Sequence, residues 1–316
     1  MEGIVCACGA SALELYRSSK RLIPTLLDKP RTGKVAGLMV PPRQFLEDDM
    51  TARGVTKQPY HVLVDGNHGY NPRRDIHAVA CYHPLPPRSL IKIDKGFWVT
   101  SPELTFIQIC ADEDLSDFDI ICLGYELCGT YVLDDSWDGL TCIDEPLTST
   151  EKIGRLINSI HRVPGIKRAR NLIKHVHDLS NSPMETILAM LVSLPTTKGG
   201  LGLGPISLNH PVATPVGQRR VDIGFPRQRV GLEYQGKEFH SIEAAGRDAR
   251  RQNKIVGSGF TILNVWYEDL IDEHLFQQLV TDLFRALGIR KRIRVAGYRT
   301  LQKLLRMPDR IRHKNS

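Results

Sequence analysis

The chain has 316 residues, of which 41% are hydrophobic and 24% are charged, and its formal net charge is +7 at pH 7. This length allows two domains, each with a sizeable core. The composition is not that of a membrane-spanning protein or a secreted disulfide scaffold, because no apolar run approaches about 20 residues and no signal-peptide pattern is present. The seven cysteines all precede residue 143. We therefore expect a cytoplasmic protein with reduced, mostly buried thiols and no membrane contact.

Charge is distributed unevenly along the chain. Residues 285–316 contain eleven Lys or Arg against a single acid, Asp309, whereas residues 96–150 contain twelve Asp or Glu and no Lys or Arg. A dense basic end suits the phosphate backbone of a nucleic acid. Both segments are also compatible with plain solvated surface, and the acidic one could dock a basic tail of this or another chain.

The first half of the chain predicts a small α+β domain over residues 1–150. A helix is expected with Ser101 as its N-cap, Pro102 at its first position and Glu103 in its first turn. Further helices are predicted at 10–17, 44–52 and 116–128, and β-favouring runs predict strands at 61–65, 76–82, 90–94 and 97–100.

A linker and a second domain follow. Helical character resumes at 148–160 and 166–179, and the change from acidic to basic charge there predicts a basic helical linker over 151–180. Residues 181–288 alternate between helices and strands, which describes a small mixed sheet with helices on its faces. The expected elements are helices at 183–194, 241–256 and 268–287, and strands at 206–210, 221–225, 230–234 and 260–266. Residues 289–316 are expected to form a basic C-terminal tail.

Two acids oppose each other in the predicted hairpin of the second domain. The centre of the hairpin falls between Arg227 and Gln228, which places Asp222 opposite Glu233. Opposed Cβ atoms lie roughly 5 Å apart on one face, and Gln235 shares that face by the strand period of two. Like charges so placed are destabilising unless a cation lies between them. Oxygen ligands at this spacing suit a hard divalent ion such as Mg²⁺.

The pattern of acids resembles that of a known nuclease superfamily. The order of elements over 180–288, with Glu185 on the first helix, Asp222 on the second strand and Glu233 on the third, resembles the PD-(D/E)XK superfamily. The resemblance is to very-short-patch-repair-like endonuclease domains of bacterial defence and toxin–antitoxin loci. It implies a restriction-endonuclease-like fold and a metal-dependent nuclease that hydrolyses phosphodiester bonds in nucleic acid, with DNA as the expected substrate.

The resemblance also implies a metal site. Glu185, Asp222 and Glu233, with the backbone carbonyl of Tyr234, would hold Mg²⁺ or Mn²⁺. A bound divalent ion lowers the pKa of a coordinated water and neutralises charge on the phosphate. We expect this chemistry to carry the hydrolysis.

Three further residues would complete the catalytic site: Gln235, Lys237 and His240. The family most often has Lys where this chain has Gln235, and Arg where it has Asn264. A neutral amide can only hydrogen-bond, and Lys237, two positions on, could supply the missing charge if the strand extends that far. His240 is equally compatible with a capping or core role. The nucleic-acid contacts that we expect are Arg251, Lys254, Arg290, Lys291, Arg292 and Arg294.

Each acid also has a plain structural explanation. Ser182 and Pro183 stand before Glu185 as in an N-terminal capping box, which by itself accounts for a Glu at this position. Asp222 and Glu233 could simply face solvent from their strands. Two acids at symmetric positions about one turn are harder to explain in this way.

The first domain carries a fainter resemblance. Residues 97–111 are similar to a segment of abortive-infection-type antitoxin and regulator proteins, which often carry the same nuclease-like C-terminal domain. Those proteins usually begin with a winged helix-turn-helix, which this sequence lacks. Two alternatives to a nuclease therefore stay open: a catalytically inactive nuclease-fold DNA-binding regulator or antitoxin, and a protein-interaction module. A homodimer or a cognate protein partner is compatible with each.

Overall fold

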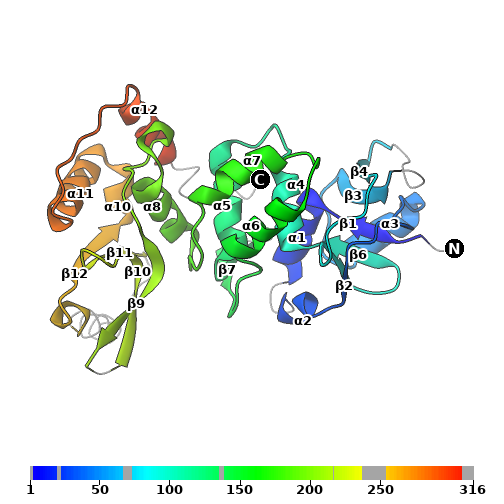
Figure 1. Ribbon diagram of the computed structural model, residues 1–316, viewed down its shortest axis with the longest axis horizontal. Coiled ribbons are helices and arrows are strands. Elements are labelled where there is room, and N and C mark those ends of the chain that lie inside the picture. The colour runs from blue at the N-terminus through cyan, green and yellow to red at the C-terminus, as the bar shows by residue number, and fades with distance from the viewer. Residues whose placement is uncertain are drawn as a thin grey trace. The chain divides into compact units, whose positions relative to one another are not determined.

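The computed structural model describes residues 3–19, 23–66, 73–134, 139–215, 217–236 and 254–307. The chain divides after Val176 into two compact units, which are taken separately below (Figure 1). Helices and mixed sheets occur in both units, so the predicted α+β class is confirmed. None of the helices in the described ranges has the length and apolar character needed to cross a membrane. All seven cysteines are free thiols, and five of them are buried.

A mixed sheet forms the core of the first unit. The strand order is β2-β5-β6-β1-β3-β4, with β1/β6 and β3/β4 parallel and the other pairs antiparallel. The four predicted strands are confirmed; β1 and β2 are too short to show a pattern in the sequence. The strands are β1 (Val5–Ala7), β2 (Arg31–Thr32), β3 (Tyr60–Asp65), β4 (Ile76–Cys81), β5 (Leu90–Lys92) and β6 (Phe97–Thr100).

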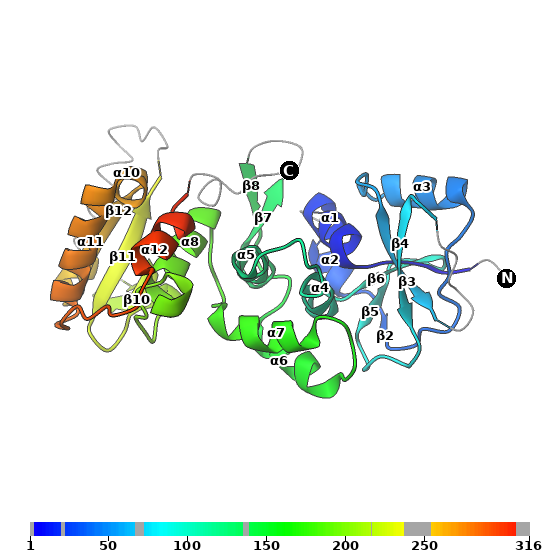
Figure 2. The same ribbon diagram turned by 90° about the horizontal axis from the view of Figure 1, so that it is seen from above.

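Helices cover this sheet, and polar caps fix where several of them begin. The side chain of Ser101 accepts the backbone N–H of Leu104 at the start of α4, and Ser116 forms a capping box with Asp119 in α5. In Figure 2, α1 and α4 lie side by side against the sheet. The elements are α1 (Gly9–Ser19), α2 (Ile23–Leu27), α3 (Arg43–Thr51), α4 (Pro102–Ile109), α5 (Asp117–Cys128), the hairpin β7 (Tyr131–Asp134) and β8 (Gly139–Cys142), α6 (Thr150–Ser159), α7 (Ile166–Leu172) and a 3₁₀ turn (Ile173–His175).

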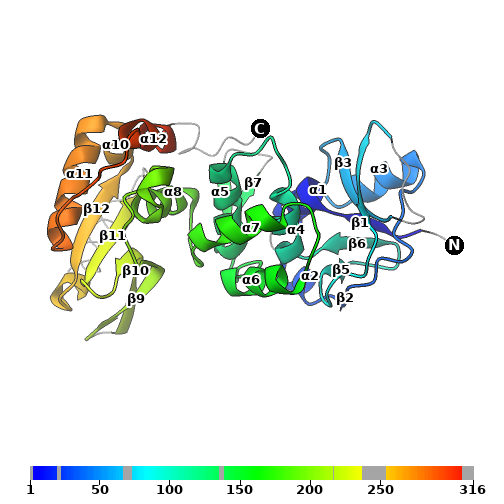
Figure 3. The same cartoon turned by 45° about the horizontal axis from the view of Figure 1, so that its top comes forward.

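Most of the segment expected as a linker, 151–180, contributes instead to the first unit, which ends at Val176. Helices α6 and α7 pack against α4, and α7 also packs against α5 (Figure 3). The apolar side chains of Ile153 and Ile157 are buried on the inner face of α6. On α7, Arg168 donates to the Asp117 carboxylate at 3.0 Å and to the carbonyl of Leu115 at 2.6 Å. The basic helix therefore neutralises part of the acidic segment 96–150 within one unit.

The second unit is a four-stranded mixed sheet between helices. The strand order is β12-β11-β10-β9, with β11/β12 parallel and the other two pairs antiparallel. Helix α11 lies on one side of the sheet and α8 with α12 on the other (Figures 1 and 2). The elements are α8 (Pro183–Ser193), a 3₁₀ turn (Thr196–Lys198), β9 (Ser207–Thr214), β10 (Gly217–Phe225), β11 (Val230–Gln235), β12 (Thr261–Trp266), α10 (Tyr267–Ile271), α11 (Glu273–Ala286) and α12 (Tyr298–Leu305).

Several elements of this unit differ from their predicted extents: the strand expected at 221–225 begins at Gly217, and two further differences have a clear physical reason. The helix expected over 268–287 is interrupted at Asp272, whose backbone is extended and whose carboxylate accepts the N–H of Leu275 at 2.8 Å. Asp272 thus ends α10 and caps α11, because a short acidic side chain satisfies the free N–H groups of a helix start. The strand expected at 206–210 runs on to Thr214 through Pro211. It lies at the edge of the sheet, where a proline costs no ladder hydrogen bond.

The basic segment 289–316 is not simply an extended tail. Its residues 298–305 form α12, which packs against α8 and the Thr196–Lys198 turn. Arg306 is 5% exposed, donates to the carbonyl of Leu270 at 3.0 Å, pairs with Glu273, and lies 4.1 Å from the centroid of the Phe276 ring. Arg306, one of the ten basic residues of this segment, is therefore part of the packed interior of the unit.

Candidate active site

The register of the β10–β11 hairpin is the predicted one. Ile223 pairs with Leu232, and the same register places Asp222 opposite Glu233. The ladder between these two strands ends at the Ile223 pair. The two acids therefore stand where the paired part of the hairpin stops.

Asp222 uses its side chain to bridge the two strands at this point. Its Oδ2 accepts the backbone N–H of Tyr234 at 2.8 Å. On its other side, the register with β9 places Asp222 opposite Asn209, which has a left-handed backbone with φ of 45°. Asn adopts this conformation more readily than most residues. The backbone pairing of the sheet is thus irregular on both sides of Asp222. Across the hairpin, the Asp222 carboxylate is the acceptor for the N–H of Tyr234.

Glu185 approaches from the first turn of α8. Ser182 is the N-cap of this helix, and its Oγ accepts the N–H of Glu185 at 3.2 Å. The Glu185 carboxylate in turn accepts the N–H of Asn181 at 2.9 Å and the hydroxyl of Ser182 at 3.2 Å. Because α8 packs on β10 and β11, its N-terminal turn is brought to the hairpin. Ser182 caps the helix as expected, but the Glu185 carboxylate accepts the N–H of Asn181 where a full capping box would use that of Ser182. Glu185 as a residue is 8% exposed.

The carboxylates of Glu185 and Asp222 influence one another. Burial and, second, the charge of Asp222 raise the pKa of Glu185 from 4.5 to about 8, although the hydrogen bonds from Asn181 and Ser182 oppose this shift. An acid with such a pKa retains its proton near neutral pH unless a cation reaches it. The pair therefore has the electrostatic character of a cation site rather than of a solvated surface.

Glu233 and Tyr234 lie next to this pair on the central strand β11. Glu233 is 9% exposed, so the solvent-facing alternative does not apply to it. Burial, followed by the charges of Glu268 and Tyr267, raises the pKa of the Tyr234 phenol. The phenol thus stays protonated at any physiological pH.

Gln235 is held by a neighbouring amide. Its Nε2 donates to Oδ1 of Asn264 on β12 at 2.9 Å. These two residues occupy the positions at which the sequence departs from the nuclease motif. The Gln235 amide group thus has an acceptor and the Asn264 carbonyl has a donor. This contact fixes the orientation of Gln235 at the end of β11.

The three acids do not form one cluster. Within the described ranges, no three His, Cys, Asp or Glu side chains gather closely enough to hold a metal ion. The interacting carboxylates of Glu185 and Asp222 nevertheless fit a divalent cation in charge and ligand type. Mg²⁺ commonly takes one or two carboxylates and completes its shell with water and substrate phosphate. The residues present fit a two-carboxylate site better than the predicted three-acid cage.

The remaining predicted residues fall into two groups. Lys237, His240 and Arg251 lie outside the described residues. The other predicted nucleic-acid contacts are all exposed, as that role requires: Lys254, Arg290, Lys291, Arg292 and Arg294. Lys291 donates to the side chain of Gln277 at 3.1 Å, which ties it to α11.

Two asparagines near the acids were missed by the sequence analysis. Asn181 donates its N–H to Glu185, and its side-chain oxygen accepts from Asn209 at 3.4 Å. Neither belongs to a motif, so no signal in the sequence could have found them.

Comparisons of the chain with protein-family models, with curated proteins and with solved structures find no match.

Proposed function

We propose that the second unit is a metal-dependent endonuclease that hydrolyses phosphodiester bonds in nucleic acid, with DNA as the expected substrate. The observation that carries this proposal is the coupling of the Glu185 and Asp222 carboxylates beside the hairpin, with the pKa of Glu185 raised to about 8. Perturbed acids that share a site are typical of functional centres. The mixed sheet between helices supports a restriction-endonuclease-like fold. The resemblance to nucleases of bacterial defence and toxin–antitoxin loci suggests such a context, in the cytoplasm.

The residues of the site would have different roles in hydrolysis. Glu185 and Asp222 would hold Mg²⁺ or Mn²⁺, with Glu233 and the Tyr234 carbonyl as neighbouring oxygen donors. Such an ion, when bound, makes water a better nucleophile and offsets charge on the phosphate. Gln235, oriented by Asn264, can hydrogen-bond the attacking water or a phosphate oxygen.

Substrate binding is assigned to the exposed basic residues of the same unit. Arg290, Arg292 and Arg294 lie in the stretch between α11 and α12 and are exposed. Guanidinium groups bind phosphate oxygens in bidentate fashion. Contacts of this kind position the backbone and do not read bases, so we expect weak sequence preference.

A cleavage assay tests the proposal directly. The full chain is incubated with Mg²⁺ or Mn²⁺ and single- or double-stranded DNA or RNA, beside Asp222→Asn and the control Asp282→Asn. We expect cleavage by the wild type and by the control, and a loss of about a hundredfold or more in Asp222→Asn. Intact substrates in every lane, together with no metal binding by calorimetry, would overturn the proposal.

A second candidate is a nuclease-fold DNA-binding regulator or antitoxin without activity. The bond between Gln235 and Asn264 favours it, because the position at which a charged Lys is commonest carries a neutral amide that is already engaged. This candidate predicts salt-sensitive DNA binding that persists in Asp222→Ala and Glu233→Ala. It also predicts no cleavage by the wild type with either metal.

A further inference from the structure

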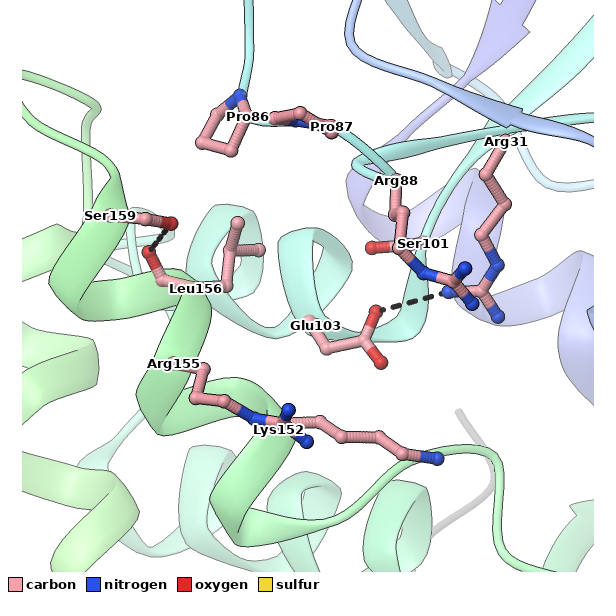
Figure 4. A pocket seen from close by; sticks show the side chains of 10 residues that line it. All are labelled: Arg31, Pro86, Pro87, Arg88, Ser101, Glu103, Lys152, Arg155, Leu156 and Ser159. Carbon is pink, nitrogen blue, oxygen red and sulfur yellow. Dashed lines mark hydrogen bonds and ion pairs between the residues drawn. The ribbon is translucent and has the colours of Figure 1, made fainter.

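A pocket of about 510 Å³ opens in the first unit, far from the acids in sequence. Its walls come from β2, the loop before β5, the start of α4 and the outer face of α6. Figure 4 shows basic side chains from two sides pointing into the same space. The lining residues are Arg31, Pro86, Pro87, Arg88, Ser101, Glu103, Lys152, Arg155, Leu156 and Ser159.

The lining is strongly cationic. Four basic side chains and a single carboxylate, that of Glu103, line the pocket, and one of the four, Arg155, also pairs with Glu151 on α6 at 3.7 Å. Glu103 is already satisfied in part, because its Oε1 accepts the hydroxyl of Thr148 at 2.7 Å. Its Oε2 is 3.8 Å from the guanidinium of Arg31, which is too long for a hydrogen bond. The pocket therefore keeps an excess of positive charge in a unit whose segment 96–150 is acidic.

The guanidinium of Arg31 has N–H groups that are not fully used in hydrogen bonds to the described residues. Its Nε is buried and donates no hydrogen bond to any described residue. Among the described residues, and apart from the ion pair with Glu103, the guanidinium of Arg31 makes one long hydrogen bond of 3.4 Å, to the carbonyl of Leu27. A buried guanidinium N–H without an acceptor is costly, and the same guanidinium belongs to a residue that lines the pocket.

Arg88, which lines the pocket, has a restricted backbone conformation. It has a left-handed φ of 74°, which a residue with a long side chain rarely adopts. The turn around it is fixed by Ser89, whose N–H and hydroxyl donate to the carbonyl of Pro86 at 3.3 and 2.8 Å. Two prolines precede Arg88 in this wall and restrict it further.

We propose that this pocket binds a small phosphorylated molecule. Its volume lies in the range of sites for nucleotide-sized ligands. Guanidinium groups match the geometry of phosphate oxygens, and several cations suit a group with more than one negative charge. The prolines and Leu156 offer an apolar wall for the rest of the ligand. This inference does not depend on the nuclease proposal, which concerns the other unit.

Calorimetry with the full chain tests the proposal, with EDTA present to exclude metal-bridged binding. The probes are inorganic pyrophosphate and adenosine 5′-monophosphate, with adenosine as the uncharged comparison. We expect both phosphates to bind and adenosine to bind at least about tenfold more weakly. Lys152→Glu should weaken pyrophosphate binding by about tenfold or more, whereas Lys167→Glu, an exposed lysine on α7 outside the pocket, should leave it unchanged.

A second variant separates direct contact from general charge. Arg31→Gln should weaken binding of pyrophosphate at least as much as Lys152→Glu does, and a thermal melt shows whether the unit stays folded. Equal weakening by Lys152→Glu and Lys167→Glu would overturn the proposal, as would absence of binding by either phosphate. A short DNA duplex that competes for the pocket more strongly than pyrophosphate would assign it to nucleic acid and also overturn it.

Discussion

The carboxamides of Gln235 and Asn264 are joined across β11 and β12 by a hydrogen bond of 2.9 Å. The two residues that differ from the nuclease motif are thus neighbours in the structure. If Gln235 acts on the water or the phosphate, its orientation depends on Asn264. Substitution of Gln235 or of Asn264 should therefore change the rate of cleavage.

We expect Gln235→Ala to lower kcat by about tenfold to a hundredfold, because it removes a hydrogen bond to the reacting groups. Asn264→Ala should lower kcat less, since Gln235 remains but is less well oriented. Steady-state cleavage kinetics measure both. Equal activity of Gln235→Ala and wild type would remove Gln235 from the mechanism.

Metal affinity should depend on pH through Glu185. Its pKa is about 8, so a cation must displace a proton at lower pH. Below that value, the Mn²⁺ association constant should rise by about tenfold per pH unit and then level off. Titrations at a series of pH values measure this slope, and Glu185→Gln should abolish it. An affinity that does not change between mildly acidic and mildly alkaline pH would contradict the assignment.

The same shift affects folding stability in the absence of metal. A carboxyl whose folded pKa lies above its unfolded value of 4.5 favours the folded state most at low pH, and this contribution is lost as pH rises from 4.5 toward 8. We expect Glu185→Gln to be more stable than wild type at pH 8 by about 1 kcal/mol or more, with a smaller or reversed difference at pH 5. Urea unfolding at the two pH values tests this. A difference that is independent of pH would contradict it.

Asp222 should have separable structural and chemical roles. Asp222→Ala removes the acceptor of the Tyr234 N–H and should destabilise the unit by about 1–2 kcal/mol. Asp222→Asn keeps a side-chain oxygen at that position, so it should recover most of this stability while metal binding stays weak. Chemical denaturation and metal titration distinguish the two effects. If Asp222→Asn bound metal like the wild type, the carboxylate would have a structural role alone.

The basic residues after α11 should differ sharply in role. Arg306→Ala should destabilise the second unit by about 3 kcal/mol, because it leaves the carbonyl of Leu270 without its donor and removes the packing against the ring of Phe276. Arg292→Ala should leave stability nearly unchanged and lower the salt dependence of DNA binding by about one unit of slope. Melting curves and DNA titrations across a range of salt concentrations measure these effects. Loss of DNA affinity without loss of stability in Arg306→Ala would reverse the assignment.

The sequence by itself determined the elements whose signals are local. The turn between two β-favouring runs fixed the register that sets Asp222 against Glu233, and Ser182 before Pro183 and Glu185 fixed the start of α8. Hairpin register and helix caps depend on residues within a few positions of one another. Such features can be read without knowing the fold.

Only the tertiary structure decided which residues from distant segments form ion pairs and which become buried. The hydrogen bond from Arg168 to Asp117 ties most of the expected linker to the first unit. Burial of Arg306 makes part of the expected tail a packed element of the second unit. Burial also set the pKa of Glu185, and side-chain geometry joined Gln235 to Asn264. These outcomes depend on desolvation and contacts between residues far apart in the chain, which no local pattern encodes.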